Sequence, residues 1–300
     1  MSQPLVKLRP WQVEPFWKDD VGLLVLSWRR RAGKSHMMAS KSLRQMMEKA
    51  GILNIFMSAS ITLGQEFIRK EYEVWTSVLS KFRELTKASG QMIESNVDGL
   101  EVDDFCDLFE HGKLETKIWH DRTTFSRSKV IAPNPGTAVG YGGNLYVDEF
   151  GRIANFKEVL EAVMPFIDDN PDFRCVMAST PPPDDAHYSW ELTLPPVDDF
   201  PINPAGNWYE SQAGFIVHRV DAYDAYAGGH PIYDQKTKQP LSPDEHRAIY
   251  FDKTAWDRNY GLKYLTGGTA AVSLAALTRS MALGRQYACQ ARDITEEVAL

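Results

Sequence analysis

The feature that most constrains the fold of this chain is an apolar run that leads through a basic turn into a predicted helix. The run at residues 23–26 reads Leu-Leu-Val-Leu, which is typical of a strand buried on both faces. The turn ends in Gly-Lys-Ser at 33–35, and helical spacing continues through residues 39–47. A second buried strand is predicted at 52–60 and a second helix at 67–85. This alternation predicts an α/β fold with a parallel sheet.

The turn between this strand and its helix has the chemistry of a nucleotide phosphate loop. The pattern G-x-x-x-x-G-K-[ST] requires a glycine five residues before Gly33, and Trp28 stands there instead. The other residues fit, because Gly33 lets the backbone approach a phosphate, Lys34 reaches the β- and γ-phosphates, and the Ser35 hydroxyl can bind Mg²⁺. The following helix would direct its free N–H groups at the same anion. The alternative is a surface turn that happens to contain Gly-Lys-Ser, so the rest of the chain must decide.

Composition restricts the class of protein and its partners. The chain has 300 residues, 43% hydrophobic and 24% charged, as in ordinary globular proteins. Its three cysteines, Cys106, Cys175 and Cys289, lie far apart, which argues against a disulfide framework or a zinc site and favours a reducing cytoplasm. We find neither a secretory signal nor an apolar run that could span a bilayer, so no membrane partner is expected. The net charge of −7 argues against a protein that coats nucleic acid with its whole surface.

Side chains within and before the loop are assigned to the nucleotide. The dense basic cluster Arg29-Arg30-Arg31 lies inside the turn, which suits a nucleotide better than DNA. Upstream, Trp11 offers an aromatic ring, and Gln12 offers an amide that can pair with the adenine edge through one donor and one acceptor. For this upstream segment the alternative is a plain turn that leads into a helix and carries a packed tryptophan.

A later strand ends in two carboxylates that suit the same site. The sequence Asn-Leu-Tyr-Val at 144–147 is followed by Asp148 and Glu149. Open α/β sheets bind ligands at the carboxyl ends of their strands. There Asp148 can hold Mg²⁺ through water or the Ser35 hydroxyl, and Glu149 can polarise the water that attacks the γ-phosphate. An edge strand that meets a polar turn is the alternative for an Asp-Glu pair in isolation.

The segment from residue 173 onward predicts one more core strand and then a change of character. The strand at 173–178 ends in Ser179-Thr180, whose hydroxyls could lie near the γ-phosphate, although Ser-Thr-Pro is also an ordinary strand stop. Residues 184–207 are predicted to form a loop or lid, and one strand returns at 214–221.

Four further segments complete the prediction. Alternation at 113–131 predicts a β-hairpin, and Ser242 is expected to cap a helix that has proline at its first position. Residues 270–283 are predicted to form a mostly apolar helix. The acidic segment 101–107 is interpreted as a solvated helix face, because no histidine or cysteine at a suitable spacing supports a metal site.

Together these segments resemble the ATPase domain of the large terminase subunit, the motor that packages DNA into tailed-bacteriophage heads. The matching pieces are an adenine motif, a variant phosphate loop, an Asp-Glu strand and a coupling motif, at residues 8–12, 30–35, 145–149 and 179–181. In that family the first loop glycine is usually missing, and an arginine three residues before the Gly-Lys, the position of Arg30, is usual. One departure is Val139-Gly140, where many relatives have Arg-Gly, and this places in doubt any cation role there.

The resemblance implies a three-layer P-loop NTPase of the additional-strand, catalytic-glutamate (RecA-like) type with a small lid subdomain. In that fold the strand at 173–178 lies between the loop strand and the Asp148 strand. Residues 1–183 would form the ATPase core, and residues 184–300 the lid, the returning strand and the C-terminal helices. The candidate site residues are Glu149, Arg30 and Lys34 for catalysis, Ser35 and Asp148 for Mg²⁺, and Gln12, Trp11, Arg29, Arg31, Ala32, Gly33, Lys34, Ser35, Ser179 and Thr180 for ATP.

The implied activity is Mg²⁺-dependent ATP hydrolysis that drives viral double-stranded DNA into a procapsid. The implied partners are DNA, the portal ring, the small terminase subunit and further copies in a ring on the portal, with a monomer expected for the isolated domain, in the cytoplasm of an infected bacterium. We find no counterpart of the family's nuclease domain, so nuclease activity is not expected.

Two other functions are compatible with parts of the pattern. A superfamily 2 helicase would need a second RecA-like lobe, which the sequence after Pro183 does not show. A nucleotide-sensing assembly module would bind ATP without hydrolysing it.

Overall fold

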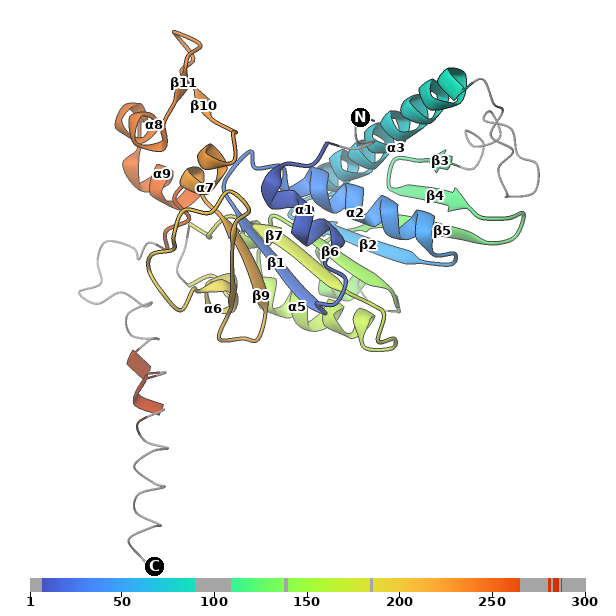
Figure 1. Ribbon diagram of the computed structural model, residues 1–300. Coiled ribbons are helices and arrows are strands. Elements are labelled where there is room, and N and C mark those ends of the chain that lie inside the picture. Colours follow the sequence, from blue (N-terminus) through green and yellow to red (C-terminus); the bar gives the residue numbers. More distant parts are fainter. Residues whose placement is uncertain are drawn as a thin grey trace, which may run out of the picture.

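The structure is built on one sheet of nine strands, whose order differs from their order in the chain. The computed structural model describes residues 7–89, 109–137, 140–183, 186–264, 280–281, 283–285 and 287. Across the sheet the order is β3-β4-β5-β2-β6-β7-β1-β9-β8 (Figure 1). In chain order the strands are β1 Leu23–Trp28, β2 Leu53–Ser58, β3 Phe109–His111, β4 Glu115–Trp119, β5 Phe125–Ile131, β6 Asn144–Asp148, β7 Cys175–Ser179, β8 Asn207–Glu210 and β9 Ile216–Val220.

Neighbouring strands from β5 to β9 are parallel, whereas β3, β4 and β8 extend the two edges in antiparallel pairs. The residues of β6 and β7 are buried, as are all but the first of β1 and of β2. Burial on both faces explains why these segments read as nearly continuous apolar runs. β7 pairs with β1 on one side and with β6 on the other, as the resemblance implied.

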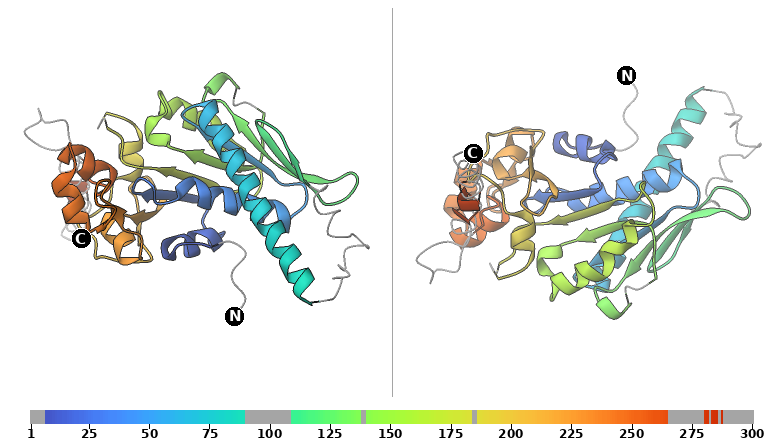
Figure 2. Two further views of the ribbon diagram at one scale, coloured as in Figure 1. Left: turned by 90° about the horizontal axis from the view of Figure 1, so that it is seen from above. Right: turned by 90° about the horizontal axis from the view of Figure 1, so that it is seen from below.

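Helices cover both faces of the sheet, as Figures 1 and 2 show. One face carries α1 Pro10–Trp17, α2 Lys34–Glu48 and α3 Ile61–Ser89, and the other carries α5 Phe156–Val163 and α6 Ser189–Thr193. Short 3-10 turns are η1 Pro135–Thr137, η2 Phe150–Arg152 and η3 Met164–Ile167. Within the described ranges, no helix combines the length and the hydropathy that crossing a membrane requires.

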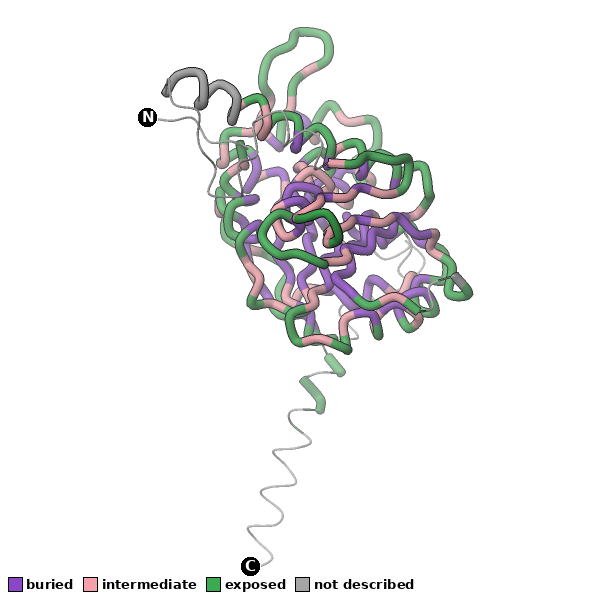
Figure 3. Tube along the Cα trace, turned by 90° about the vertical axis from the view of Figure 1, so that its right-hand side faces the viewer, coloured by how far each residue is buried: buried purple, intermediate pink, exposed green. Residues whose placement is uncertain are grey.

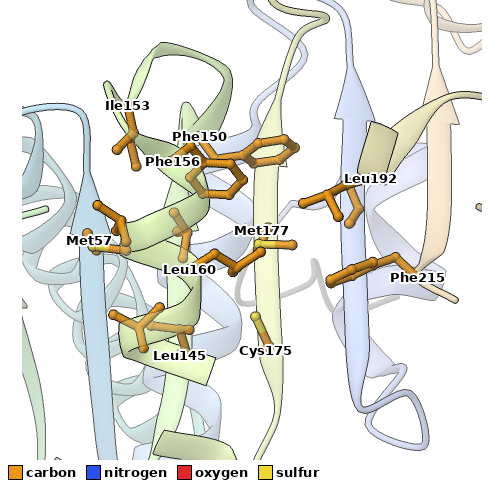
Figure 4. Packing of buried hydrophobic residues seen from close by; sticks show 14 of the residues in the cluster. Met57, Leu145, Phe150, Ile153, Phe156, Leu160, Cys175, Met177, Leu192 and Phe215 are labelled. Carbon is orange, nitrogen blue, oxygen red and sulfur yellow. The ribbon is translucent and has the colours of Figure 1, made fainter. Parts of the chain in front are cut away.

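Each face of the sheet buries its own hydrophobic cluster. On the face that carries α5, side chains from the sheet pack against those of the helix, including Met57, Leu145, Phe156, Met177 and Phe215 (Figure 4). The cluster under α1, α2 and α3 includes Trp11, Leu26, Trp28, Phe56 and Phe67. The buried residues accordingly run through the centre of the molecule (Figure 3).

The C-terminal helices gather at the end of the sheet where β1 leads into the loop (Figure 1). They are α7 Ala222–Ala227, α8 Pro243–Ile249 and α9 Lys253–Asn259, with a small hairpin of β10 Ile232–Tyr233 and β11 Pro240–Leu241. Trp256 in α9 donates from Nε1 to His246 Nδ1 at 2.8 Å. Arg247 donates from Nε to Asp257 Oδ1 at 2.7 Å and from Nη2 to Oδ2 at 2.8 Å. The Ala222 amide donates to the Tyr260 carbonyl at 2.8 Å. These bonds tie the three helices into one unit.

Several segments agree with the sequence and others differ for identifiable reasons. The predicted hairpin is β4 and β5, and Ser242 caps α8 by accepting from the Glu245 amide. α3 begins at Ile61, earlier than predicted, because Ser60 Oγ accepts from the Leu63 amide in its first turn. The region predicted as a loop, residues 184–207, contains the short helix α6. The strand β8 was not predicted, and its pairing with β9 stabilises it.

Two predicted segments cannot be compared with the structure. The acidic segment 101–107 lies outside the described residues, and so does most of the helix predicted at 270–283.

One buried carboxyl group beneath α3 makes stability depend on pH. Glu71 is 0% exposed, and Ser42 Oγ donates to its Oε1 at 2.7 Å, while Oε2 has no hydrogen-bond partner in the described part of the chain. Burial raises the pKa of Glu71 to about 7, against the pull of the nearby hydroxyls. The folded protein therefore holds a proton that the unfolded chain releases, and stability decreases as the pH rises from about 4.5 to about 7.

Replacing Glu71 by glutamine should remove this pH dependence, because the amide is neutral throughout the range. We expect Glu71→Gln to gain stability relative to the parent protein by up to about 3 kcal/mol as the pH rises across that window. Urea unfolding at a series of pH values measures the difference. Glu73→Gln, on the exposed side of the same helix, is the matched control and should keep the parental slope. Parallel stability curves for Glu71→Gln and the parent would contradict the assignment.

Candidate functional site

The loop between β1 and α2 has the backbone shape of an anion cradle. Gly33 caps α2 with a left-handed φ of 87°, and Arg31 is also left-handed at 63°. A Cβ atom at Gly33 would lie 2.6 Å from Gln12 Nε2, so both the conformation and the close contact require glycine. The first N–H groups of α2, like those of any helix, lack acceptors within the helix and can bind an anion at this turn.

Trp28 replaces the first glycine of the motif because this position belongs to the core rather than to the cradle. Its ring is 0% exposed, and Nε1 donates to His218 Nδ1 of β9 at 3.0 Å. Burial lowers the pKa of His218 to about 4, so the neutral ring accepts at Nδ1 and donates from Nε2 to the Ala205 carbonyl at 2.9 Å. The tryptophan therefore anchors the start of the loop to the strand beside β1.

Helix α1 supports the loop from the other side. Trp11 Nε1 donates to the Ala32 carbonyl at 3.1 Å, and Gln12 Nε2 donates to the Gly33 carbonyl at 3.0 Å. Gln12 Oε1 also accepts from the Arg9 amide at 2.8 Å. The Gln12 amide thus holds the loop and keeps one N–H and one lone pair unused by these bonds. Its pairing with adenine stays a prediction.

Lys34 brings a positive charge into the buried part of the loop. Its side chain is 6% exposed, and Nζ donates to the Trp28 carbonyl at 3.0 Å and lies 3.8 Å from Glu149 Oε1. Burial lowers the pKa of Lys34, while the carboxylates of Glu149 and Asp148 oppose the shift. Its binding of phosphate oxygens stays a prediction.

The end of β6 meets the start of α2 through a hydroxyl and a carboxylate. Ser35 Oγ donates to Asp148 Oδ2, a bond between residues that are 113 positions apart in the chain. Burial raises the pKa of Asp148, and the neighbouring charge of Glu149 adds to the effect. A hydroxyl beside a carboxylate is a donor set that suits Mg²⁺, which takes few protein ligands when a nucleotide supplies phosphate oxygens. Among the described residues no cluster of three or more His, Cys, Asp or Glu could hold a metal unaided.

Glu149 is held in an uncommon backbone conformation at the tip of β6. Its φ is 53°, and its amide donates to Asp148 Oδ1 at 3.0 Å. The carboxylate lies between two cations, with Oε1 3.8 Å from Lys34 and Oε2 3.9 Å from Arg152 Nε. A left-handed residue that is not glycine at a strand end is typical of a functional position.

β7 delivers two further hydroxyl groups to the same edge of the sheet. Ser179 Oγ accepts from the Gly151 amide at 3.1 Å, which ties the end of β7 to the turn that follows Glu149. Thr180 lines a cavity of about 330 Å³ beside that turn. The structure thus gathers Ser35, Asp148, Glu149, Ser179 and Thr180 at one edge, as parallel strands require.

The three arginines of the loop have different positions. Arg29 is 2% exposed, and its Nη2 donates to the His230 carbonyl at 3.0 Å, so its side chain contacts the C-terminal part of the chain. Burial lowers the pKa of Arg29 to about 10. Arg30 and Arg31 are exposed. The charge of Arg30 is close enough to lower the pKa of Lys34. The assignments of all three to the nucleotide stay predictions.

Some residues at this edge were not identified from the sequence. Arg9 donates from Nη1 to the Arg31 carbonyl at 3.0 Å, and Arg152 stands beside Glu149. Arg258 and Asn259 reach the edge from α9, and the Asn259 carbonyl accepts from the Arg30 amide at 2.9 Å. Arg152 is three residues after Glu149, a local signal that could have identified it. Arg258 has no such signal, because only tertiary packing brings α9 to the loop.

No family model and no curated protein sequence matches this chain, but solved structures do. The large terminase ATPase domain of Thermus phage P74-26 aligns over 86% of this chain and 100% of its own length, with 13% identity and a TM-score of 0.56. The large terminase of a thermophilic bacteriophage, solved in complex with ADP, aligns over 86% of this chain and 54% of its own, with 10% identity and a TM-score of 0.51. At such low identity the likeness concerns the fold. The chain has the RecA-like P-loop fold of phage large terminase ATPase domains.

Proposed function

We propose that this chain is the ATPase motor of a phage DNA-packaging machine, which hydrolyses ATP with Mg²⁺ and drives double-stranded DNA into a procapsid. The observation that carries the proposal is the double contact between the loop and the end of β6, in which Ser35 bonds to Asp148 and Lys34 faces Glu149. These four side chains supply a phosphate ligand, a metal site and a base for water. The fold shared with terminase ATPase domains supports the packaging role.

The proposed reaction assigns one role to each side chain. Lys34 would bind β- and γ-phosphate oxygens, and Ser35 and Asp148 would hold Mg²⁺, which would supply charge neutralisation to the phosphates. Glu149 takes a proton from a water molecule as the water oxygen bonds to the γ-phosphorus atom. The bond between that phosphorus and the bridging oxygen breaks, and ADP and phosphate are the products. Arg30 is proposed to stabilise the negative charge that develops on the γ-phosphate oxygens during phosphoryl transfer.

The remaining assignments are proposed from the sequence motifs and their resemblance to the terminase ATPase domain. Gln12 would pair with adenine, and Trp11, whose ring is 0% exposed, would serve the nucleotide by holding the loop through the Ala32 carbonyl rather than by stacking on the base. Arg29, Arg31, Ala32 and Gly33 would form the cradle, and Ser179 and Thr180 would report the state of the γ-phosphate to the sheet. We propose residues 1–183 as the ATPase core and residues 184–300 as the lid part. As partners we propose DNA, a portal ring, a small terminase subunit and further copies in a ring, with a monomer for the isolated domain.

Loss of Lys34 and loss of Glu149 should both abolish hydrolysis but should differ in binding. Lys34→Ala removes ground-state phosphate contacts and should weaken ATPγS binding. Glu149→Gln keeps the shape of the side chain and should retain binding, while its rate decreases by about 10²-fold or more. Phosphate release and calorimetric titration measure the two effects, and Glu158→Gln, an exposed carboxylate on α5, is the matched control. A Glu149→Gln rate equal to that of the parent would refute the base assignment, and a parent that binds ATP without turnover would favour the nucleotide-sensing module.

The role of Gln12 in base recognition can be separated from its support of the loop. If Gln12 pairs with adenine, Gln12→Ala should reduce the preference for ATP over GTP by about 1–3 kcal/mol, the scale of a bidentate base contact. The ratio of the two dissociation constants is the useful measurement, because damage to the loop weakens both nucleotides equally. An unchanged ratio with weaker binding of both would leave Gln12 with its observed structural contact to Gly33 only.

Mixing two inactive variants tests whether Arg30 acts on the nucleotide of a neighbouring subunit. Arg30 is exposed, and we find no hydrogen bond or ion pair from its guanidinium to the described residues. If Arg30 acts on the nucleotide of the next subunit, its loss should reduce the rate by about 10³-fold, the scale of an arginine finger. Arg30→Ala mixed with Glu149→Gln should then regain activity, since some sites combine an intact Glu149 with a neighbour's intact Arg30. Absent activity in mixed rings would restrict Arg30 to its own site.

A further inference from the structure

Beside the proposed ATP site lies a second hollow that is lined by two arginines. The cavity measures about 330 Å³, and its walls include Gly151 and Arg152 from η2, Thr180 after β7, and Arg258 and Asn259 from the end of α9. Among the residues that the structure describes, no acidic side chain lines it. Two guanidinium groups in the lining favour the binding of an anion there.

Arg258 is the more informative of the two arginines. It is half-buried, and we find no hydrogen bond or ion pair for its side chain within the described ranges. The adjacent carboxylate, Asp257, is already held by the two bonds from Arg247. A guanidinium carries five N–H donors, and those of Arg258 are not engaged by acceptors from the described residues, so they are free to bind an anion. Arg152 has only the long 3.9 Å contact with Glu149 and is also available.

The cavity adjoins the phosphate loop through its lining residue Asn259. The Asn259 carbonyl accepts from the Arg30 amide at 2.9 Å, so the residue after Arg258 is bonded directly to the loop. The Gly151 amide bonds to Ser179 Oγ at 3.1 Å, immediately before Thr180. The charge of Arg152 lies close enough to Lys34 to lower its pKa. Arg152 is therefore near Lys34, and Arg258 lines the same cavity as Arg152.

We propose that Arg258 and Arg152 form a phosphate site that receives the terminal phosphate of the nucleotide or the phosphate released from it. The inference rests on the proposed ATPase function and adds a ligand from α9 to it. The planar fork of Arg258 can bind two phosphate oxygens at once. Because α9 is bonded to α7 and α8 through Tyr260, His246 and Asp257, a bond from Arg258 to phosphate sets the position of the three C-terminal helices. Their position then depends on the state of the nucleotide.

Nucleotide binding by the full chain tests this site. For Arg258→Ala we expect about tenfold weaker binding of ATPγS with Mg²⁺, the loss of a charge-assisted hydrogen bond, and unchanged binding of ADP. Arg258→Lys should recover part of the affinity, since it keeps the charge but not the fork. Lys236→Ala, which removes one charge from the exposed β10–β11 turn, is the matched control and should leave both affinities unchanged. Titration of inorganic phosphate into the ADP complex tests whether the site binds the released phosphate rather than the γ-phosphate of the nucleotide. Weaker binding by Arg258→Ala of either ATPγS or inorganic phosphate supports the site.

Hydrogen exchange gives a second readout that a purely structural role would not change. In the parent protein the amides of α9 should exchange more slowly with ATPγS than with ADP, and Arg258→Ala should abolish this difference. Equal affinities of the parent and Arg258→Ala for ATPγS and for phosphate would overturn the inference and leave the ATPase proposal standing. Equal losses for ADP and ATPγS would also overturn it, because they indicate a distorted loop. Failure of the parent protein to bind ATPγS would instead reject the proposed function itself.

Discussion

The buried charge of Lys34 is the constraint on which the rest of the site depends. An ammonium group with 6% of its side chain exposed is unfavourable unless carbonyls and carboxylates surround it. The loop supplies the Trp28 carbonyl, and the end of β6 supplies Glu149 at 3.8 Å with Asp148 beside it. In the strand order β6-β7-β1, the loop after β1 and the carboxylates after β6 both lie at the carboxyl ends of parallel strands, with β7 between them. The strand order thus brings the carboxylates to the buried ammonium group.

The supports of the loop come from three parts of the chain. Trp28 fixes its beginning to β9 through His218, and α1 holds its middle through Trp11 and Gln12. α9 adds a backbone bond from Arg30 to Asn259. A glycine at position 28 would make the start of the loop flexible. Here these bonds to neighbouring elements hold the loop in place instead. A loop fixed in this way is prepared for an anion, and its shape is coupled to the C-terminal helices.

Positive charge is distributed around this edge of the sheet rather than concentrated in the motif. Arg29 is buried and contacts the His230 carbonyl, whereas Arg30 and Arg31 remain exposed. Arg152 and Arg258 line the adjoining cavity. The chain as a whole is acidic, so these cations stand out against a net charge of −7. Such a local field attracts a polyphosphate to one place on an otherwise negative protein.

The sequence by itself determined the parallel α/β class, the loop at 33–35 and the strands that carry Asp148 and Ser179, because burial on two faces and glycine chemistry are local properties. The place of β7 between β1 and β6 came from the resemblance and is confirmed by the ladder. Only the tertiary structure decided that Trp28 is a core residue, that Arg29 contacts the His230 carbonyl, and that α9 brings Arg258 to the loop. The first two of these contacts join residues that are 190 and 201 positions apart, and no periodicity within a short window encodes such pairs.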